Sequence, residues 1–445
     1  SSFANELGGI EMKKTWVNWG KNQRCHPSRI ERPSSGKEVA DLVSLGVAER
    51  QKVRPVGAGH SFSPICPTDG IIIDLSNFDS ITDVNRQLLQ VTVGAGIRLY
   101  ELNTRLESLG MALPNLGDID VQTLAGAIST GTHGTGMQHH SISNSVIGMT
   151  LITGDGGLLE CSKNINEHIF NAARVSLGSL GIITEVTLQC VEAFNLRALE
   201  RTTNIVEVLE QFEDQMQNAD HIEFFWFPHT EIAELKINMK TLDPPNYRSP
   251  MKAFMSDEVI QNGGFELINR YGKLFPHHAH RLLEKSLPNN RKASYVSASY
   301  KVFCSKRRVR FKEMEYAVPQ ECLLEAFQRV REVTNLLERP VTFPVEVRVL
   351  GSDDIPLSPA FGRDSGFIAV HVYQGTSHDP YFQMVEKIMS DYDGRPHWGK
   401  IHSLTSLELS KLYPRWDNFQ TVLNELDPDG HFSNPYLEKV LRGSI

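Results

Sequence analysis

Two segments rich in small residues place the strongest limit on how this chain can fold. The first, Gly57–Ser61, reads GAGHS and follows the short predicted strand 52–56. The second lies about 70 residues later, where nine of the eleven residues from 126 to 136 are Gly, Ala, Ser or Thr. Such residues bury little apolar area in a strand, but they let a backbone approach a bulky anion closely. We therefore expect the two segments to hold a pyrophosphate from two sides.

The first segment is not a Rossmann fingerprint. A Rossmann turn has a third glycine and a helix that begins at once. Here the turn is followed by prolines at positions 64 and 67, which oppose an immediate long helix. Phosphate contacts at this turn would come from backbone N–H groups. A plain tight turn between two strands is the alternative interpretation.

The arrangement of predicted elements changes near residue 195. Before it, strands and helices alternate, with an amphipathic helix near 99–109. After it, the pattern favours a helix over 195–220, and residues 240–295 read as loops and short helices because they are rich in Pro, Asn and Gly. Strands are predicted at 52–56, 71–75, 88–93, 147–159, 182–190, 221–228, 344–350 and 366–373, and a later helix near 415–426.

Composition narrows the class of protein. A chain of 445 residues favours two domains. Its net charge of -8 argues against a nucleic-acid partner. The six cysteines are widely spaced, which favours a reducing compartment. The N-terminal residues carry no apolar signal sequence, and no run approaches 18 apolar residues. A soluble, cytoplasmic protein without stable membrane insertion is expected.

The strand at 344–350 carries two charges on one face. It reads PVEVRVL, so Glu346 and Arg348 point to one side and the valines to the other. Two charges on an otherwise apolar strand are costly to bury unless each has partners. They predict either catalytic groups or a structural ion pair at a domain interface.

Five motifs together resemble one flavoprotein family. They are VGAGHSFSP (56–64), GTHGTG (131–136), PVEVR (344–348), RPHWGK (395–400) and SNPYLEKV (433–440). In this order they are similar to the aldonolactone oxidoreductases, the gulonolactone oxidase group of the vanillyl-alcohol oxidase flavoproteins. The match is weakest over 240–295, where animal members carry apolar, membrane-associated sequence and this chain does not.

The resemblance implies a two-domain α+β fold. An FAD-binding domain of two α+β subdomains would span 1–194, and a cap domain with an antiparallel sheet over the flavin would span 195–390. The segment 391–445 would return to the FAD domain.

The resemblance also implies that FAD is bound covalently through His60; a histidine in a glycine turn would otherwise be read as a hydrogen-bonding or surface residue. The expected cofactor-binding residues are Val56, Gly57, Ala58, Gly59, His60, Ser61, Gly117, Asp118, Ser129, Gly131, Thr132, His133, Gly134, Gly181, Ile182, Ile183, His397 and Lys400.

Four residues are expected to be catalytic. By resemblance, Glu346 would bind substrate hydroxyls or take up a proton, and Arg348 would stabilise negative charge on the substrate or the flavin. Lys400 would lie beside the substrate alcohol, unless it is a surface lysine. His371 and Tyr373, which share a strand face, would both line the pocket. No metal site is expected, since the clustered histidines lack carboxylate or cysteine partners at ligand spacing.

The implied reaction is oxidation of the C2 hydroxyl of an aldono-1,4-lactone, with oxygen as acceptor. L-gulono-1,4-lactone would give the ene-diol ascorbate and hydrogen peroxide. Gly117 occupies the position at which an alanine would obstruct oxygen, although a turn glycine fits equally well. An alditol oxidase, a lactone dehydrogenase with another acceptor, and a non-catalytic flavin- or sugar-binding protein are the alternatives.

Overall fold

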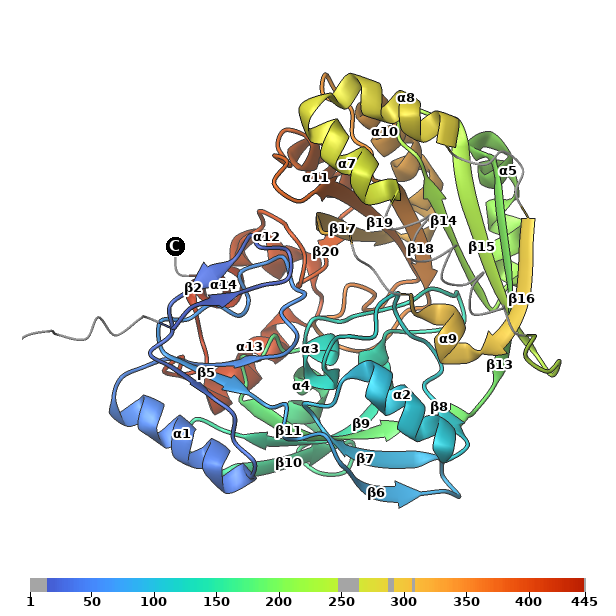
Figure 1. Cartoon of the computed structure of the whole chain (residues 1–445). Helices are drawn as coiled ribbons and strands as arrows, with labels where there is room; N and C mark the ends of the chain where they lie inside the picture. Colours follow the sequence, from blue (N-terminus) through green and yellow to red (C-terminus); the bar gives the residue numbers. More distant parts are fainter. Residues whose placement is uncertain (1–13, 247–263, 287–291, 306–308, 444–445) are drawn as a thin grey trace, which may run out of the picture.

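The computed structural model describes residues 14–246, 264–286, 292–305 and 309–443. Helices and sheets are mixed, as the α+β prediction requires. Figure 1 shows two parts. In one, the N-terminal elements (blue to green) lie beside the C-terminal helices (red); in the other, a large sheet (green to orange) lies with its own helices.

A small parallel sheet carries the first glycine turn. Its strand order is β3-β5-β4, and both outer strands run parallel to β5. The GAGHS turn therefore leaves the sheet at the carboxyl end of β4. The bounds are β3 (Arg29–Glu31), α1 (Gly36–Ala48), β4 (Val53–Val56) and β5 (Ile71–Asp74); β1 (Trp16–Val17) pairs separately with β2 (Arg24–Cys25).

An antiparallel five-stranded sheet follows, in the order β10-β9-β11-β7-β6. The predicted strand segment 147–159 forms the hairpin of β9 and β10, which turns at Gly-Asp-Gly-Gly, a sequence typical of hairpin turns. The strands are β6 (Ile81–Asn85), β7 (Gln90–Gly94), β9 (Val146–Ile152), β10 (Leu158–Ser162) and β11 (Ile182–Gln189). Between and after them lie α2 (Leu99–Ser108), β8 (Met111–Ala112), α3 (Leu124–Ser129), η1 (Ile142–Ser145), α4 (Glu167–Ala173) and β12 (Val191–Glu192).

The large sheet has eight strands in the order β16-β13-β15-β14-β18-β19-β17-β20. Its strands are β13 (Asn195–Asn204), β14 (His221–Trp226), β15 (Ile232–Thr241), β16 (Lys292–Ala298), β17 (Phe311–Pro319), β18 (Val345–Leu350), β19 (Ser365–Tyr373) and β20 (Arg395–Pro396). Its helices are α5 (Ile205–Asn218), α7 (Gly264–Leu274), α8 (Pro276–Ser286), α9 (Ser299–Phe303), η3 (Gln320–Cys322), α10 (Leu323–Asn335) and α11 (Tyr381–Ser390).

The two faces of the large sheet differ in chemistry. Apolar side chains of β14, β17, β18 and β19 pack in one core with α5, α10 and α11. Because side chains alternate along a strand, the intervening residues point to the other face. That face carries buried charged and polar groups on three adjacent strands: Glu313, Glu315, Glu346, Arg348 and His371.

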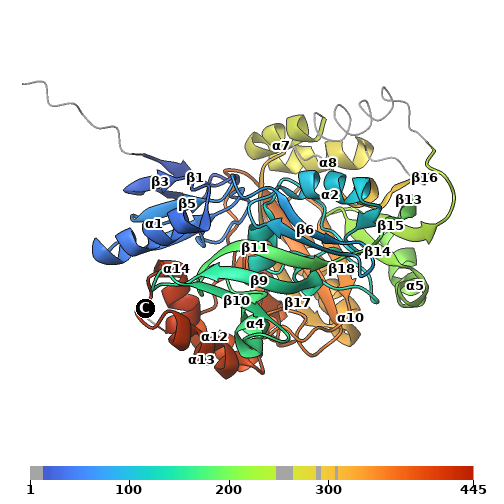
Figure 2. The same cartoon turned by 90° about the horizontal axis from the view of Figure 1, so that it is seen from below.

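The C-terminal segment packs against the N-terminal strands. Its helices share one apolar core with residues of β7, β9 and β11, and Figure 2 shows them beside the five-stranded sheet. Buried Arg54 donates hydrogen bonds to the carbonyls of Ile65, Leu177, Gly178 and Phe432. The elements are α12 (Ser406–Leu412), α13 (Trp416–Leu426), α14 (Pro435–Leu437) and η4 (Glu438–Arg442).

Asn434 of the SNPYLEKV motif forms hydrogen bonds with two segments of the chain. Its amide donates to the carbonyls of Pro64, Ile65 and Pro67, and its side-chain oxygen caps α14 at the N–H of Leu437. The motif thereby joins the end of the chain to the loop that follows the first glycine turn.

One sequence-based prediction is wrong. Residues 195–204 form β13 rather than the first half of a helix, because they pair along their length with β15 and along part of it with β16. Tertiary pairing overrides the local helical pattern there. The region 240–295, predicted as loops and short helices, contains the helices α7 and α8 and the start of β16, while its residues 247–263 and 287–291 lie outside the described part.

All six cysteines are free thiols. Among the described helices, none combines the length and the hydropathy needed to cross a bilayer.

Candidate active site

Two adjoining cavities lie between the glycine turn and the charged face of the large sheet. The first is lined by the GAGHS turn, by α3 and by residues 177–183. The second is lined by residues 117–122, by Lys400 and by the polar groups of β17, β18 and β19. His60, Ser61, Gln122 and Thr130 line both cavities, so the two meet at the turn.

Most predicted cofactor-binding residues line these cavities. Gly131, Gly134 and Ile182 are the exceptions and line neither one. Gly134 is packed so that a Cβ would lie 2.1 Å from the Leu116 carbonyl oxygen, and Ile182 is a fully buried core residue. Those that line the first or second cavity are Val56, Gly57, Ala58, Gly59, His60, Ser61, Gly117, Asp118, Ser129, Thr132, His133, Gly181, Ile183, His397 and Lys400.

The cavity walls fit a dinucleotide that carries a flavin. Backbone of the GAGHS turn faces the first cavity, and a Cβ on Gly57 would lie only 2.5 Å from Thr123 Oγ1. At the junction, the buried Gln122 side-chain oxygen has no hydrogen-bond partner among the described residues. An unpaired buried acceptor is costly, and a donor on the ribityl chain or ring of a flavin would satisfy it.

His60 stands where the two cavities meet. Its ring stacks on Trp19 with the centroids 5.1 Å apart. Burial, with help from nearby Arg98 and Arg310, lowers the pKa of His60 to about 4. The imidazole is therefore neutral at physiological pH, as a nucleophilic nitrogen must be.

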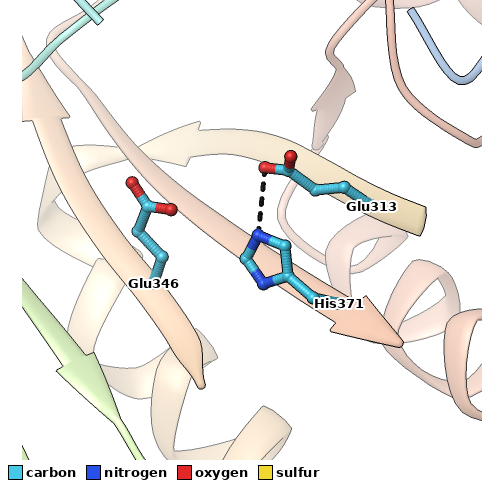
Figure 3. Close-up of side chains that lie close together, drawn as sticks. All are labelled: Glu313, Glu346 and His371. Atoms are coloured by element: carbon cyan, nitrogen blue, oxygen red, sulfur yellow. Dashed lines mark ion pairs between the residues drawn. The ribbon is translucent and has the colours of Figure 1, made fainter. Parts of the chain in front are cut away.

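Two predicted catalytic residues, Glu346 and His371, lie close to Glu313 of a neighbouring strand, which the sequence analysis did not predict. Figure 3 shows Glu346 of β18 and His371 of β19 turned towards Glu313 of β17. His371 Nε2 lies 3.3 Å from Glu313 Oε1, and ligand atoms of all three lie within 4.8 Å of one another. That spacing would suit a metal ion, but the ammonium of Lys400 already contacts Glu313.

Lys400 is held by two glutamates that sequence reasoning missed. Its Nζ lies 2.5 Å from Glu313 Oε1 and 3.5 Å from Glu315 Oε2. Burial alone would lower the pKa of Lys400, but the two carboxylates outweigh it and raise that pKa. The lysine is a cation rather than a base. The signal was available: Phe311–Pro319 reads FKEMEYAVP, with Glu at alternate positions of an apolar strand.

Arg348 is surrounded by carboxylates. It donates to Glu223 at 2.8 Å and to Asp118, and it contacts Glu346. Its guanidinium also lies 3.4 Å from the His133 carbonyl. Burial alone would lower its pKa, but Asp118, Glu346 and Glu223 raise it well above the usual value. Asp118, expected at the cofactor, is thus a partner of Arg348 as well.

At Glu346, unlike at Arg348, the effect of burial on the pKa outweighs that of the opposite charge nearby. Burial raises its pKa well above the usual range, the Arg348 contact lowers it less, and Asp118 and Glu223 add to the rise. Although Oε1 lies beside Arg348, it accepts no hydrogen bond among the described residues. Glu346 lines the second cavity, and the protonated form that its raised pKa favours can both donate to and accept from a substrate hydroxyl.

Tyr373 does not share the role of His371. Its hydroxyl donates to Glu266 of α7 at 2.7 Å, and it does not line the second cavity. The two residues share a strand face, but Tyr373 lies at the far end of β19.

Fold and cavity together define a flavin-dependent oxidoreductase. A sequence pattern described as an FAD binding domain matches residues 27–162, and that of the D-arabinono-1,4-lactone oxidase family matches residues 186–440. The chain belongs to this lactone oxidase family, which confirms the resemblance seen in its motifs.

Relatives agree along nearly the whole chain. L-gulono-1,4-lactone dehydrogenase of Mycobacterium tuberculosis is 41% identical, over 97% of this chain and 100% of the relative. L-gulonolactone oxidase of Mus musculus is 36% identical, over 95% and 97%. A structure of cholesterol oxidase from Brevibacterium sterolicum has the same fold, with a TM-score of 0.77 at 19% identity over 96% and 97%.

Replacing Gly57 by alanine should weaken FAD binding. The added Cβ would press on Thr123, and such overpacking costs about 1–3 kcal/mol, or roughly ten- to hundredfold in affinity. Gly36→Ala is the matched control, since nothing lies within 4 Å of its Cβ. The flavin-to-protein ratio of the purified variants measures the effect. An unchanged ratio in Gly57→Ala would exclude close contact between turn and cofactor.

Proposed function

We propose that this protein oxidises the C2 hydroxyl of an aldono-1,4-lactone, with L-gulono-1,4-lactone as the first candidate substrate. The observation that carries the proposal is the convergence of Lys400, Glu346 and Arg348 on the cavity that His60 also lines. The proposed unit for flavin binding is 1–194 with 391–445, and the proposed substrate cap is 195–390.

The charged groups suit the oxidation of an alcohol. Bound FAD supplies a hydride acceptor at its ring. The Lys400 cation favours alkoxide character at the reacting oxygen and so weakens the adjacent C–H bond. Glu346 accepts hydrogen bonds from substrate hydroxyls, and Arg348, held by three carboxylates, donates from a fixed position.

The overall balance requires one acceptor of two electrons. The substrate loses the hydride from C2 and the proton from its oxygen, and becomes a 2-keto lactone. That product tautomerises to the conjugated ene-diol. Oxygen, as the proposed acceptor, takes up the two electrons and two protons to become hydrogen peroxide.

Anaerobic addition of a lactone should bleach the flavin absorbance. L-gulono-, L-galactono- and D-arabinono-1,4-lactone and xylitol should be compared, and we expect L-gulono-1,4-lactone to be the fastest. Lys400→Met should slow the bleaching by roughly 10²–10³-fold, the usual effect of removing one stabilising group, with flavin content as the control. Faster bleaching by xylitol would favour an alditol oxidase, and no bleaching by any of them would favour a binding protein.

Covalent attachment of FAD through His60 is the second part of the proposal. The neutral, buried ring at the junction of the cavities supports it. His60→Ala should give a colourless acid precipitate, while wild type and the exposed-histidine control His26→Ala should stay yellow. Turnover should fall by about tenfold or more, that is by at least about 1.4 kcal/mol in the barrier. A yellow precipitate from His60→Ala would assign the bond elsewhere.

Oxygen as acceptor follows from the glycine at position 117. Gly117 lines the second cavity, and a Cβ there would lie 3.2 Å from the His133 carbonyl oxygen and 3.5 Å from Thr132 Cγ2. Alanine thus fits after a small shift. Gly117→Ala should lower peroxide formation by about tenfold or more and leave anaerobic reduction by the lactone unchanged. Equal peroxide rates, or a wild type that reduces only a dye, would contradict this assignment.

A further inference from the structure

Each ring nitrogen of His133 faces a hydrogen-bond acceptor. Nδ1 lies 2.7 Å from the carbonyl oxygen of Gly134, and Nε2 lies 2.6 Å from Glu315 Oε1. A carbonyl only accepts, so Nδ1 carries a proton. At 2.6 Å the second contact also needs a proton between its atoms. A ring flip would put carbon atoms against both acceptors, so it offers no alternative.

His371 and Glu313 repeat the arrangement on the same face of the sheet. His371 Nδ1 lies 3.0 Å from the Pro344 carbonyl, and its Nε2 faces Glu313 Oε1. Glu313 and His371 are direct partners in the β17–β19 register. Each of these two glutamate–histidine pairs therefore holds one shared proton and is neutral as a unit, whichever partner carries it.

Lys400 gives a net positive charge to the cluster that it forms with the two glutamate–histidine pairs, Glu313–His371 and Glu315–His133. It contacts both glutamates, and the two neutral pairs leave its positive charge uncompensated within the cluster. His133 and Lys400 line the cavity, whereas Glu315 is 1% exposed and lies behind them. The Glu315 side chain touches both.

We propose that Glu315 is a positioning residue that keeps His133 doubly protonated and holds Lys400 at the cavity wall, joining the second glycine-rich segment to the HWGK loop. The backbone supports the same connection, because the Glu315 carbonyl accepts from the N–H of His397 at 2.9 Å. This deepens the proposed function and rests on it only for the role of Lys400 towards substrate.

The other charged groups near Lys400 and Glu315 favour the same protonation states, a protonated lysine and an ionised glutamate. Lys400 faces Glu313 and Glu315 of β17, Glu346 of β18 and, from its own loop, His397. Burial and the nearby Lys400 cation lower the pKa of His397 to about 3, so this ring adds no charge. Near His133, the guanidinium of Arg348 lies 3.4 Å from the backbone carbonyl oxygen of His133. Burial alone would raise the pKa of Glu315, but Lys400 and His133 hold it well below the usual range.

The first test is the protonation of His133 in the holoenzyme, read by ¹⁵N NMR of histidine-labelled protein. The His133 signals are assigned by their loss in His133→Gln. We expect both ring nitrogens to carry a proton, as their two acceptor partners require. Glu315→Gln should convert the ring to the neutral Nδ1–H form, since an amide can donate to Nε2. A neutral His133 in wild type would overturn the proposal without any variant of Glu315.

The second test is the alkaline side of the pH profile. Lys400 must be protonated to act, so kcat/KM falls as pH rises through its pKa. Wild type should keep its kcat/KM to about pH 10. Glu315→Gln removes the carboxylate that lies 3.5 Å from Lys400 Nζ, together with the positive charge of His133 on its far side. The fall should therefore move to lower pH, by less than the roughly 1–3 units expected for the loss of a carboxylate alone. Glu315→Asp keeps the charge and should restore most of the wild-type profile.

If Glu315 had a purely structural role, its replacement would lower Tm without changing the pH profile. Asp427→Asn, which removes a buried carboxylate from the C-terminal segment, should lower Tm without moving the alkaline fall. If Glu315→Gln behaves in the same way, the proposal fails. The NMR measurement requires no turnover. Its outcome is therefore independent of whether the lactone is the substrate.

Discussion

The ammonium group of Lys400 is the contact on which the site depends. It joins the HWGK loop to Glu313 and Glu315 of β17, and Glu315 joins the same strand to His133 of the second glycine-rich segment. Three segments far apart in sequence meet through one cation and two carboxylates. Burying such charges is costly unless each is paired, and here each has a partner at hydrogen-bonding or ion-pair distance.

Strand alternation makes this arrangement possible. One face of the eight-stranded sheet is apolar and packs under α5, α10 and α11. The other face can then carry charges without weakening that core. Because the charged and polar groups of β17, β18 and β19 stand on hydrogen-bonded strands, and Lys400 of the HWGK loop is held by two of them, their positions are fixed before a substrate binds. Fixed charges are the most effective means of stabilising charge that develops during a reaction.

Substrate oxidation and the choice of acceptor involve different parts of the cavity wall. The cations and carboxylates come from β17, β18, β19 and the HWGK loop, whereas Gly117 comes from the segment after β8. Relatives named as an oxidase and as a dehydrogenase are both similar to this chain. Under the proposed function, a change of acceptor would require no change in the groups proposed to bind the lactone.

The sequence by itself determined the class of fold, the cofactor and a large part of the site. GAGHS lines the first cavity, and Thr132 and His133 of GTHGTG line the second, as do Glu346, Arg348 and Lys400 of PVEVR and HWGK. These residues could be singled out by local rules, glycine where backbone must come close and alternation in a strand, and by the family motifs; their roles stay predictions.

Only the tertiary structure decided which charges are partners. The pairing of Glu313 and Glu315 with Lys400, and of Asp118 and Glu223 with Arg348, depends on the strand order β14-β18-β19-β17 and on how the loops return to it. The same long-range pairing made 195–204 a strand despite its helical pattern. Contacts between residues about 85 to 230 positions apart leave no periodicity along the chain, so no local rule can predict them.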